Sequence, residues 1–366
     1  MADLHVVYVN YLSARELRDS IGSVLEGLDH ALDLEITVVD NSCCAKEAER
    51  LAAWLPSDVR RIWSETNVGF ARACNLGAAD GSAPYLLFLN PDTVVPPGTL
   101  RRIHSELVRR NGNALVGPRH YADDQRRYAH APFRGARLFD EAWDQLWARG
   151  WQRGRSLAYL RQRAHLAGAD QPVPVRSISG GCLGVGRSAF AELGGWDERY
   201  WLYGEDLELC VRARRRGAPV LLLPDAGVVH YMERSARQLA DRVQSARVEG
   251  RSRFKRARYG SWLRQFERIT ERVSARCPRR GDPWDGIGIW DGSPLRAPEA
   301  CSRWAVEIAR SPLFDNCLTV FPRQRFEEPP TEMIHGLPSG QYFLRVVGED
   351  RPNRWTRDVL QTFTIP

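Results

Sequence analysis

Lysine is almost missing from this chain of 366 residues. Of its 52 Lys and Arg residues, only Lys46 and Lys255 are lysines, an arginine excess that is typical of a GC-rich genome and indicates no function by itself. No uncharged apolar run approaches the ~20 residues that a membrane-spanning helix needs, and the first residues lack the layout of a signal peptide. The sequence therefore predicts a soluble, cytoplasmic protein.

Metal-binding and disulfide patterns of cysteine are also missing. The eight cysteines form no C-x-x-C pair and no Cys/His array with zinc spacing, so we expect reduced, mostly buried thiols. Hydrophobic residues make up 43% of the chain and charged residues 27%, a balance that excludes wholesale disorder. The length predicts about two domains.

Three short apolar runs alternate with helix-type stretches in the first hundred residues. The runs cover residues 4–9, 34–39 and 85–89, and the helical stretches cover 14–28, 45–55 and 71–79. This alternation predicts an α/β fold, with a mostly parallel sheet flanked by helices. Ligands of such sheets gather at the carboxyl ends of the strands. Asn10, Asp40, Asn90 and Asp92 stand at these ends.

Beyond residue 117 the sequence pattern changes twice, first to a basic helical segment and then to short β-type runs. Residues 118–172 predict helices and loops flanking a site, and 175–185 and 220–223 predict strands. Residues 232–280 are helical in pattern and basic, with fifteen Arg or Lys and five Asp or Glu, a net charge of +10. Beyond Gly281 come short β-type runs at 305–309, 318–321, 342–347 and 360–365. We expect two domains, 1–280 and a small all-β sandwich over 284–366.

Asp92 is held in a fixed turn directly after an apolar strand. Pro91 lacks an N–H and restricts Asn90, so the strand stops there. A carboxylate in such a place suits Mg²⁺ or Mn²⁺, which takes one or two protein oxygens and completes its shell with substrate phosphates. An Asx turn without any ligand explains the motif equally well.

Glu205 and Asp206 open a helix after Gly204. Acidic residues in a first helical turn are favoured by the helix dipole, so simple capping is one explanation. The second is a binding site, because aromatic side chains that could stack against a sugar precede the pair: Trp196, Tyr200, Trp201 and Tyr203. His230, after another apolar run, is by itself more typical of a satisfied polar residue than of a ligand.

Nine short motifs follow one another in a fixed order. They are Asn10-Tyr11, Val38-Val-Asp-Asn-Ser42, Asn67-Val-Gly-Phe-Ala71 with Asn75, Asn90-Pro-Asp92, Ser179-Gly-Gly-Cys-Leu183, Gly194-Gly-Trp-Asp197, Tyr203-Gly-Glu-Asp206, Arg212-Ala-Arg214 and His230. Over residues 3–260 this series resembles the family 2 glycosyltransferases with a GT-A (Rossmann-like) fold, especially bacterial rhamnosyltransferase-like members. Residues 284–366 resemble a fibronectin type III-like sandwich.

The resemblance implies a role for each matching residue. Asp206 corresponds to the catalytic base, and Asp92 and His230 to the metal site, although the motif here is Asn-x-Asp and not Asp-x-Asp. The donor nucleotide would contact Asn10, Tyr11, Asp40, Asn67, Gly69, Phe70, Asn90 and Asp92. The acceptor would contact Gly180, Gly181, Trp196, Tyr203 and Glu205.

The implied function is sugar transfer from a nucleoside diphosphate, dTDP- or UDP-linked, to a glycan or lipid-linked acceptor in bacterial surface polysaccharide synthesis. A divalent ion would offset the charge of the departing diphosphate. An Asp kept ionised at a helix N-terminus would take the proton of the incoming hydroxyl, and in-line displacement would invert the anomeric carbon. Rhamnose is the donor sugar that the resemblance suggests.

Three interpretations compete for the basic segment 232–280. It is a solvated helical face, a surface for anionic lipid at the inner face of the cell membrane, or a nucleic-acid site, which the missing stacking motif argues against.

Two other functions compete with sugar transfer. Gly184, Gly186 and Ala189 mimic the fingerprint of an NAD(P)-binding oxidoreductase, and Asp206 lies twenty residues past Gly186. A non-catalytic sugar-binding protein of the same fold is the third alternative.

Overall fold

A computed structural model describes residues 2–28, 32–131, 150–231, 240–260, 262, 265, 268, 288–299, 301–310, 317–329, 331–337, 339–352 and 354–365. The chain divides into two compact units. The first comprises Met1–His120, Pro132–Gly135 and Asp170–Ala257, and the second Tyr121–Ala131, Ala136–Ala169 and Arg258–Pro366. The predicted boundary between 280 and 284 stays a prediction.

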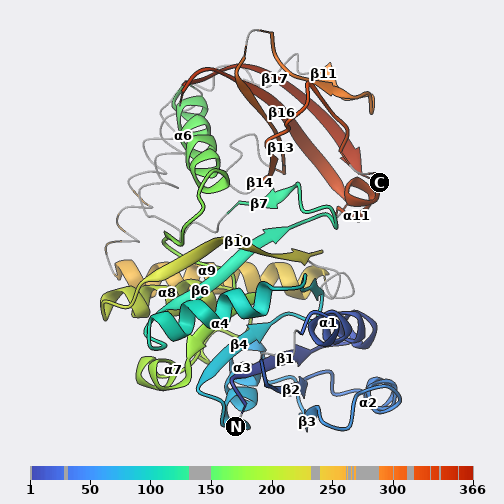
Figure 1. The fold of residues 1–366 in the computed structure, drawn as a ribbon, viewed down its shortest axis with the longest axis vertical. Helices are drawn as coiled ribbons and strands as arrows, with labels where there is room; N and C mark the ends of the chain where they lie inside the picture. The colour runs from blue at the N-terminus through green and yellow to red at the C-terminus, as the bar shows by residue number, and fades with distance from the viewer. Residues whose placement is uncertain are drawn as a thin grey trace. The chain divides into compact units, whose positions relative to one another are not determined.

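The first unit is built on a mixed, mostly parallel sheet in the order β6-β9-β4-β1-β2-β3 (Figure 1). Its parallel strands are β1 (Leu4–Asn10), β2 (Leu34–Asp40), β3 (Arg60–Trp63) and β4 (Tyr85–Leu89). The antiparallel strands are β9 (Cys182–Gly186) and β6 (Leu115–Tyr121). A long strand, β10 (Val220–His230), pairs with β6 and with the short strands β5 (Thr93–Val94) and β8 (Val173–Pro174). The predicted α/β class is confirmed.

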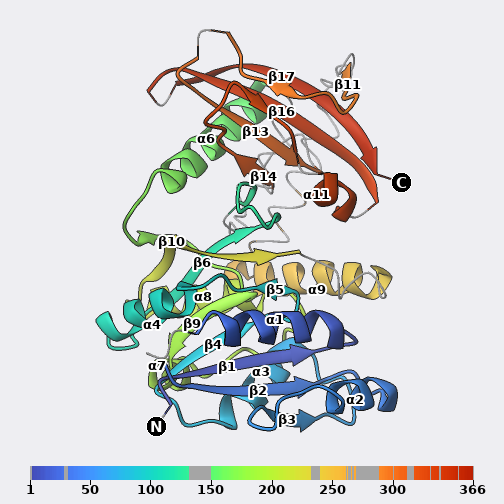
Figure 2. The same ribbon diagram turned by 45° about the vertical axis from the view of Figure 1, so that its right-hand side comes forward.

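Helices cover both faces of this sheet (Figures 1 and 2). The helices α1 (Ala14–Glu26), α2 (Ala45–Ala52) and α4 (Thr99–Arg109) share one apolar core with Leu4, Val6 and Tyr8 of β1. On the opposite face, α3 (Phe70–Ala79), α7 (Arg187–Leu193) and α8 (Glu205–Arg215) pack with Val7 and Val9. Successive side chains of β1 therefore pack into two different cores, one on each face of the sheet, because side chains alternate between the faces of a strand.

Two predicted strands have different bounds in the structure. The strand expected over 175–185 is confined to Cys182–Gly186, because Ser179-Gly180-Gly181 forms a loop before it. The strand expected over 220–223 continues through Pro224 to His230. Both differences matter for function, since they set the positions of Gly181 and His230. Of the helical prediction for 232–280, the structure describes α9 (Ala240–Tyr259), and most of 261–280 lies outside the described residues.

The second unit contains an antiparallel sheet of β7 (Ala129–His130), β14 (Cys317–Val320), β13 (Arg303–Ala309), β16 (Gly340–Arg351) and β17 (Arg354–Ile365), with β11 (Gly288–Ile289) parallel to β17. Leu295 of a second sheet, formed by β12 (Leu295–Arg296) and β15 (Phe326–Glu327), packs into the core on one face, together with α11 (Thr331–Gly336). The predicted C-terminal strands are confirmed. The fibronectin type III-like character stays a prediction.

The helix α6 (Gly150–Ala167) belongs to this second unit, although it comes from the middle of the chain. This helix lies beside the sheet (Figure 2). Its residues Leu160 and Ala164 pack against the sheet. Beside them the carboxylate of Glu307, fully buried on β13, accepts hydrogen bonds from the guanidinium groups of Arg163 and Arg345. A buried carboxylate needs such partners, so the ion triad binds α6 to the sheet. No helix among the described residues is both long and apolar enough to cross a membrane.

Candidate active site

Asn10 and Asp40 lie side by side at the carboxyl ends of β1 and β2, where they are register partners. Both are fully buried, and the amide of Asn10 donates to Asp40 Oδ1 and to Ser42 Oγ, each at 3.1 Å. The other carboxylate oxygen, Asp40 Oδ2, is buried and has no hydrogen-bond partner among the described residues. One oxygen of Asp40 is therefore fixed, and the other is left to accept a hydrogen bond from a ligand.

The turn into α3 continues this edge of the sheet. The side chain of Asn67 accepts hydrogen bonds from Asn41 Nδ2 at 2.9 Å and from the Gly69 N–H at 3.0 Å. Gly69 has a φ of +87°, and a β-carbon there would lie 2.6 Å from the ring of Trp201. The Phe70 N–H donates to the Trp201 carbonyl at 2.7 Å. Sequence analysis gave Asn41 no role, because its partner Asn67 is distant in the sequence.

Asp92 and His230 meet although 138 positions separate them. The short strand β5 pairs His230 of β10 with Thr93, which brings Asp92 Oδ1 within 3.2 Å of His230 Nε2. Asn90 Nδ2 lies 3.3 Å from the same ring nitrogen, and both Asp92 and His230 are buried. In the described part of the chain, no group of three or more His, Cys, Asp or Glu side chains is arranged to hold a metal ion. Two side chains at this place, the imidazole of His230 and the carboxylate of Asp92, are of the kinds that could ligate a cation.

A glycine pair joins this site to Asp206. The Gly180 N–H donates to Asp206 Oδ2 at 3.3 Å. A β-carbon on Gly180 would lie 3.5 Å from the β-carbon of Asp206, whereas one on Gly181 would lie 2.6 Å from His230 Cε1. Asp206 and His230 therefore touch consecutive residues of one loop, and Asp92 lies beyond His230. The structure brings together the three residues on which the sequence analysis depended.

Asp206 and Glu205 occupy the first turn of α8, after Gly204 with a φ of +97°. Burial raises the pKa of Asp206, although hydrogen bonds from the Gly180 and Leu207 N–H groups lower it again. Burial and the neighbouring Asp206 raise the pKa of Glu205 to about 8. Desolvation therefore outweighs these hydrogen bonds, and the role of the helix N-terminus in keeping Asp206 ionised stays a prediction.

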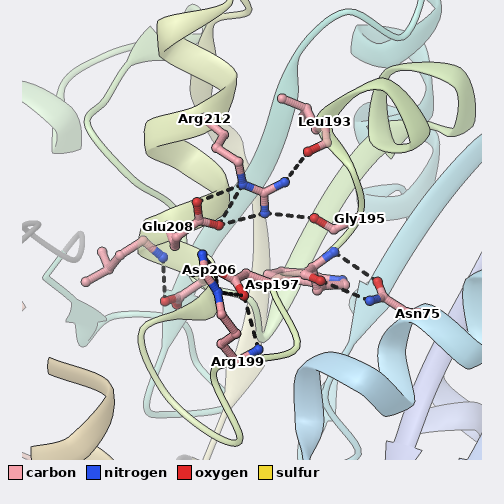
Figure 3. A network of polar contacts seen from close by, with 10 residues as sticks. Asn75, Leu193, Gly195, Asp197, Arg199, Asp206, Glu208 and Arg212 are labelled. Carbon is pink, nitrogen blue, oxygen red and sulfur yellow. Dashed lines mark hydrogen bonds and ion pairs between the residues drawn. The ribbon is translucent and has the colours of Figure 1, made fainter. Parts of the chain in front are cut away.

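Arg212 anchors α8 to the preceding loop (Figure 3). Its Nε donates to Glu208 Oε2 at 2.7 Å, and its NH2 group donates to the Gly195 carbonyl at 2.8 Å. A further hydrogen bond joins NH1 to the Leu193 carbonyl. From the other side, Asn75 donates to the Trp196 carbonyl at 2.9 Å. The ion pair of Glu208 and Arg212 thus fixes the loop that leads to Asp206.

The predicted aromatic stacking surface is wrong for two of its four members. Trp196 is only 1% exposed and Tyr200 only 2%. The ring of Trp196 packs edge-on against Phe88, with centroids 5.1 Å apart, and so forms part of the core behind Gly180. Trp201 and Tyr203 are half-exposed, and the Arg247 guanidinium lies 4.8 Å from the Tyr203 ring centroid.

The positions of Gly186 and Asp206 in the fold contradict the alternative of an NAD(P)-binding oxidoreductase. A Rossmann fingerprint requires its acidic residue at the end of the second strand, where it reaches a ribose. Asp206 instead begins a helix, and Gly186 is the last residue of β9, directly before α7.

A mostly parallel sheet with polar residues along its carboxyl edge is the arrangement in which many α/β proteins bind their ligands. The profile of Glycosyl transferase family 2 matches residues 5–192, more than half of the chain, which therefore belongs to this family and is a glycosyltransferase.

Similar proteins include several glycosyltransferases. N-acetylglucosaminyl-diphospho-decaprenol L-rhamnosyltransferase of Mycobacterium tuberculosis is 27% identical over 288 residues, which are 74% of this chain and 90% of the relative. A low-salt glycan biosynthesis hexosyltransferase of Haloferax volcanii is 25% identical over 219 residues, 58% of this chain and 62% of the relative. Among solved structures, GalNAc-T7 with UDP, GalNAc and Mn²⁺ aligns with a TM-score of 0.47 and 18% identity, covering 63% of this chain and 43% of the other.

Proposed function

We propose that the protein is an inverting, metal-assisted glycosyltransferase that acts in bacterial surface polysaccharide synthesis. Its donor is a dTDP- or UDP-linked sugar, with rhamnose as the first candidate because the mycobacterial relative carries that name. Its acceptor is a hydroxyl of a glycan or of a lipid-linked sugar. The observation that carries the proposal is that Asp206 and His230 contact Gly180 and Gly181 of one loop, and that Asp92 contacts His230.

The donor nucleoside is assigned to the carboxyl edge of β1 and β2. Asp40 Oδ2 is a buried acceptor at this edge, suited to an N–H of a pyrimidine base. Asn10 holds Asp40 from one side, and Tyr11 follows directly after it. Asn67, Gly69 and Phe70 form the adjoining turn, so one continuous wall is available to the nucleotide.

The diphosphate and its cation are assigned to Asp92 and His230. Two ligands at right angles on an octahedral ion, each ~2.1 Å from it, lie ~3 Å apart. The 3.2 Å between Asp92 Oδ1 and His230 Nε2 fits this requirement. Because these residues supply two ligands, phosphate oxygens and water would complete the shell of Mg²⁺ or Mn²⁺. Bound there, the ion would offset the negative charge of the departing diphosphate.

Asp206 is assigned as the general base. The acceptor oxygen forms a bond to the anomeric carbon as the bond from that carbon to the phosphate oxygen breaks, and the hydroxyl proton passes to the Asp206 carboxylate. A raised pKa makes an ionised carboxylate a better proton acceptor near neutral pH. The Gly180 N–H holds Oδ2 in place, and attack from the face opposite the diphosphate inverts the anomeric carbon.

The acceptor is assigned to the glycine loop and the entry to α8. Gly180 and Gly181 present backbone without side chains, which leaves room for a sugar beside Asp206. Glu205 and Tyr203 lie at the same helix start, and Trp196 supports the loop from behind.

Nucleotide binding with and without metal tests this function. We expect UDP or dTDP to raise the melting temperature, and 1 mM Mn²⁺ to increase that rise. The substitution Asp92→Ala should abolish the metal-dependent part and leave the metal-independent part. An Asp92→Ala variant with unchanged metal dependence contradicts the assignment. Turnover of a dTDP- or UDP-sugar would identify the donor.

We also propose that α9 contacts anionic membrane, where a lipid-linked acceptor resides. Arg251, Arg256 and Arg258 are exposed on this helix, together with Val248 at 60% exposure. Cationic side chains gain about 1 kcal/mol each near an anionic surface. The protein should float with vesicles that contain phosphatidylglycerol and not with neutral ones. Exchange of the three arginines for Gln should abolish flotation, and equal flotation of this variant contradicts the proposal.

A further inference from the structure

Two buried imidazole rings face each other beside the proposed metal site. His120 is the penultimate residue of β6 and His230 is the last residue of β10, and their Nδ1 atoms lie 3.0 Å apart. Their ring centroids are 5.2 Å apart, and the residues are 8% and 5% exposed. A neutral imidazole carries one N–H, so a hydrogen bond between these two nitrogens requires a proton on one of them and a lone pair on the other.

The opposite side of His230 decides which nitrogen holds the proton. Asn90 Nδ2 lies 3.3 Å from His230 Nε2, and an amide nitrogen only donates hydrogen bonds. His230 Nε2 must then accept, so the ring proton resides on Nδ1. That N–H donates to His120 Nδ1, which carries the lone pair.

This tautomer leaves two acceptors next to each other. The lone pair of His230 Nε2, which accepts the Asn90 amide, and Asp92 Oδ1 are then 3.2 Å apart, an arrangement that a cation in place of the amide would stabilise. In the opposite tautomer, Nε2–H would donate to Asp92, and the lone pair that a metal needs would be lost.

We propose that His120 is a positioning residue: by accepting the Nδ1–H of His230, it stabilises the tautomer in which a divalent cation can replace the Asn90 amide at Nε2. The inference rests on the proposed metal site at Asp92 and His230 and adds a residue that none of the sequence motifs includes. A partner that orients a metal-binding histidine through its second nitrogen typically contributes 10–100-fold to metal affinity. If His120 only filled space, a side chain of similar volume would replace it without loss of Mn²⁺ affinity.

Two substitutions separate these roles. The change His120→Leu fills the space and removes the acceptor, whereas His120→Asn retains a carbonyl oxygen near the former Nδ1. Mn²⁺ is titrated calorimetrically into each protein saturated with UDP, with dTDP in a parallel series. Nitrogen-15 NMR of histidine-labelled protein reports the tautomer of His230. The change His165→Asn, at an exposed position on α6, is the control.

We expect His120→Leu to lower the affinity for Mn²⁺ about 10–100-fold and to move the ring proton of His230 from Nδ1 to Nε2. His120→Asn should retain affinity within a few-fold, and His165→Asn should match the wild type. A His120→Leu variant with wild-type Mn²⁺ affinity and tautomer overturns the inference alone. If Mn²⁺ does not change the affinity of the wild type for UDP or dTDP, the metal site of the proposed function is wrong. The inference about His120 then fails with it.

Discussion

A β-carbon added to Gly181 would lie 2.6 Å from Cε1 of His230, closer than real β-carbon contacts. The backbone of the glycine loop therefore packs directly on the imidazole. At Gly180 the corresponding nearest contact is 3.5 Å, to the β-carbon of Asp206, which is an ordinary van der Waals distance.

This difference predicts opposite outcomes for two neighbouring substitutions. Gly181→Ala should displace His230 from Asp92 and weaken Mn²⁺-dependent binding of UDP or dTDP at least tenfold, which corresponds to about 1.4 kcal/mol. Gly180→Ala, the matched control, should retain that affinity. Calorimetry measures both, and equal affinities for the two variants contradict the assigned place of His230.

The stability of the first unit should depend on His5 at acidic pH. His5 is fully buried on β1, and it contacts Thr37 Oγ1 at 2.8 Å and Arg187 NH2 at 3.0 Å. Burial and Arg187 lower the pKa of His5 to about 4; Arg60 acts in the same direction, and Glu35 and Asp80 oppose it.

As the pH falls, the unfolded chain therefore binds a proton at His5 at a higher pH than the folded protein does. The contribution of His5 is complete above its unfolded pKa of 6.5 and is lost as the pH falls toward 4. Between pH 7 and 5 the free energy of unfolding should fall by about 2 kcal/mol from this group. His5→Gln should remove this part of the pH dependence in urea titrations. Parallel pH profiles of variant and wild type would contradict the prediction.

Glu307 should be essential to the second unit. Its replacement by Gln leaves the buried Arg163 and Arg345 without a counter-charge, which typically costs about 3–5 kcal/mol. Glu328→Gln, at an exposed position of the same unit, is the control and should be neutral. Urea titration followed by tryptophan fluorescence measures both variants. A Glu307→Gln protein as stable as the control would contradict the structural role of the triad.

The parts of the fold that depend on local pattern could be predicted. The apolar runs at 4–9, 34–39 and 85–89 became β1, β2 and β4, because a strand buried on both faces is recognisable by itself. The membership of α6 could not be predicted, since Arg163 and Glu307 are 144 positions apart and only the folded chain pairs them.

In the site, too, residues within local motifs could be predicted, and residues that act through contacts between distant segments could not. Asp92 and Asp206 lie in motifs, and the resemblance located them. His120 lies in no motif, and its significance comes from the end of β6 meeting the end of β10. Trp196 was misinterpreted because an aromatic residue near a site looks the same in a sequence whether its ring is buried or exposed.

Asp206→Asn tests the central claim most directly, because it keeps the shape of the side chain and removes the base. We expect the initial rate of sugar transfer to fall by a factor of about 10²–10⁴, while the affinity for UDP or dTDP with Mn²⁺ stays within about twofold. The control Asp225→Asn, on a side chain that is 42% exposed and pairs with Arg102, should transfer at the wild-type rate. Transfer by Asp206→Asn at a rate close to that of the wild type would contradict the account.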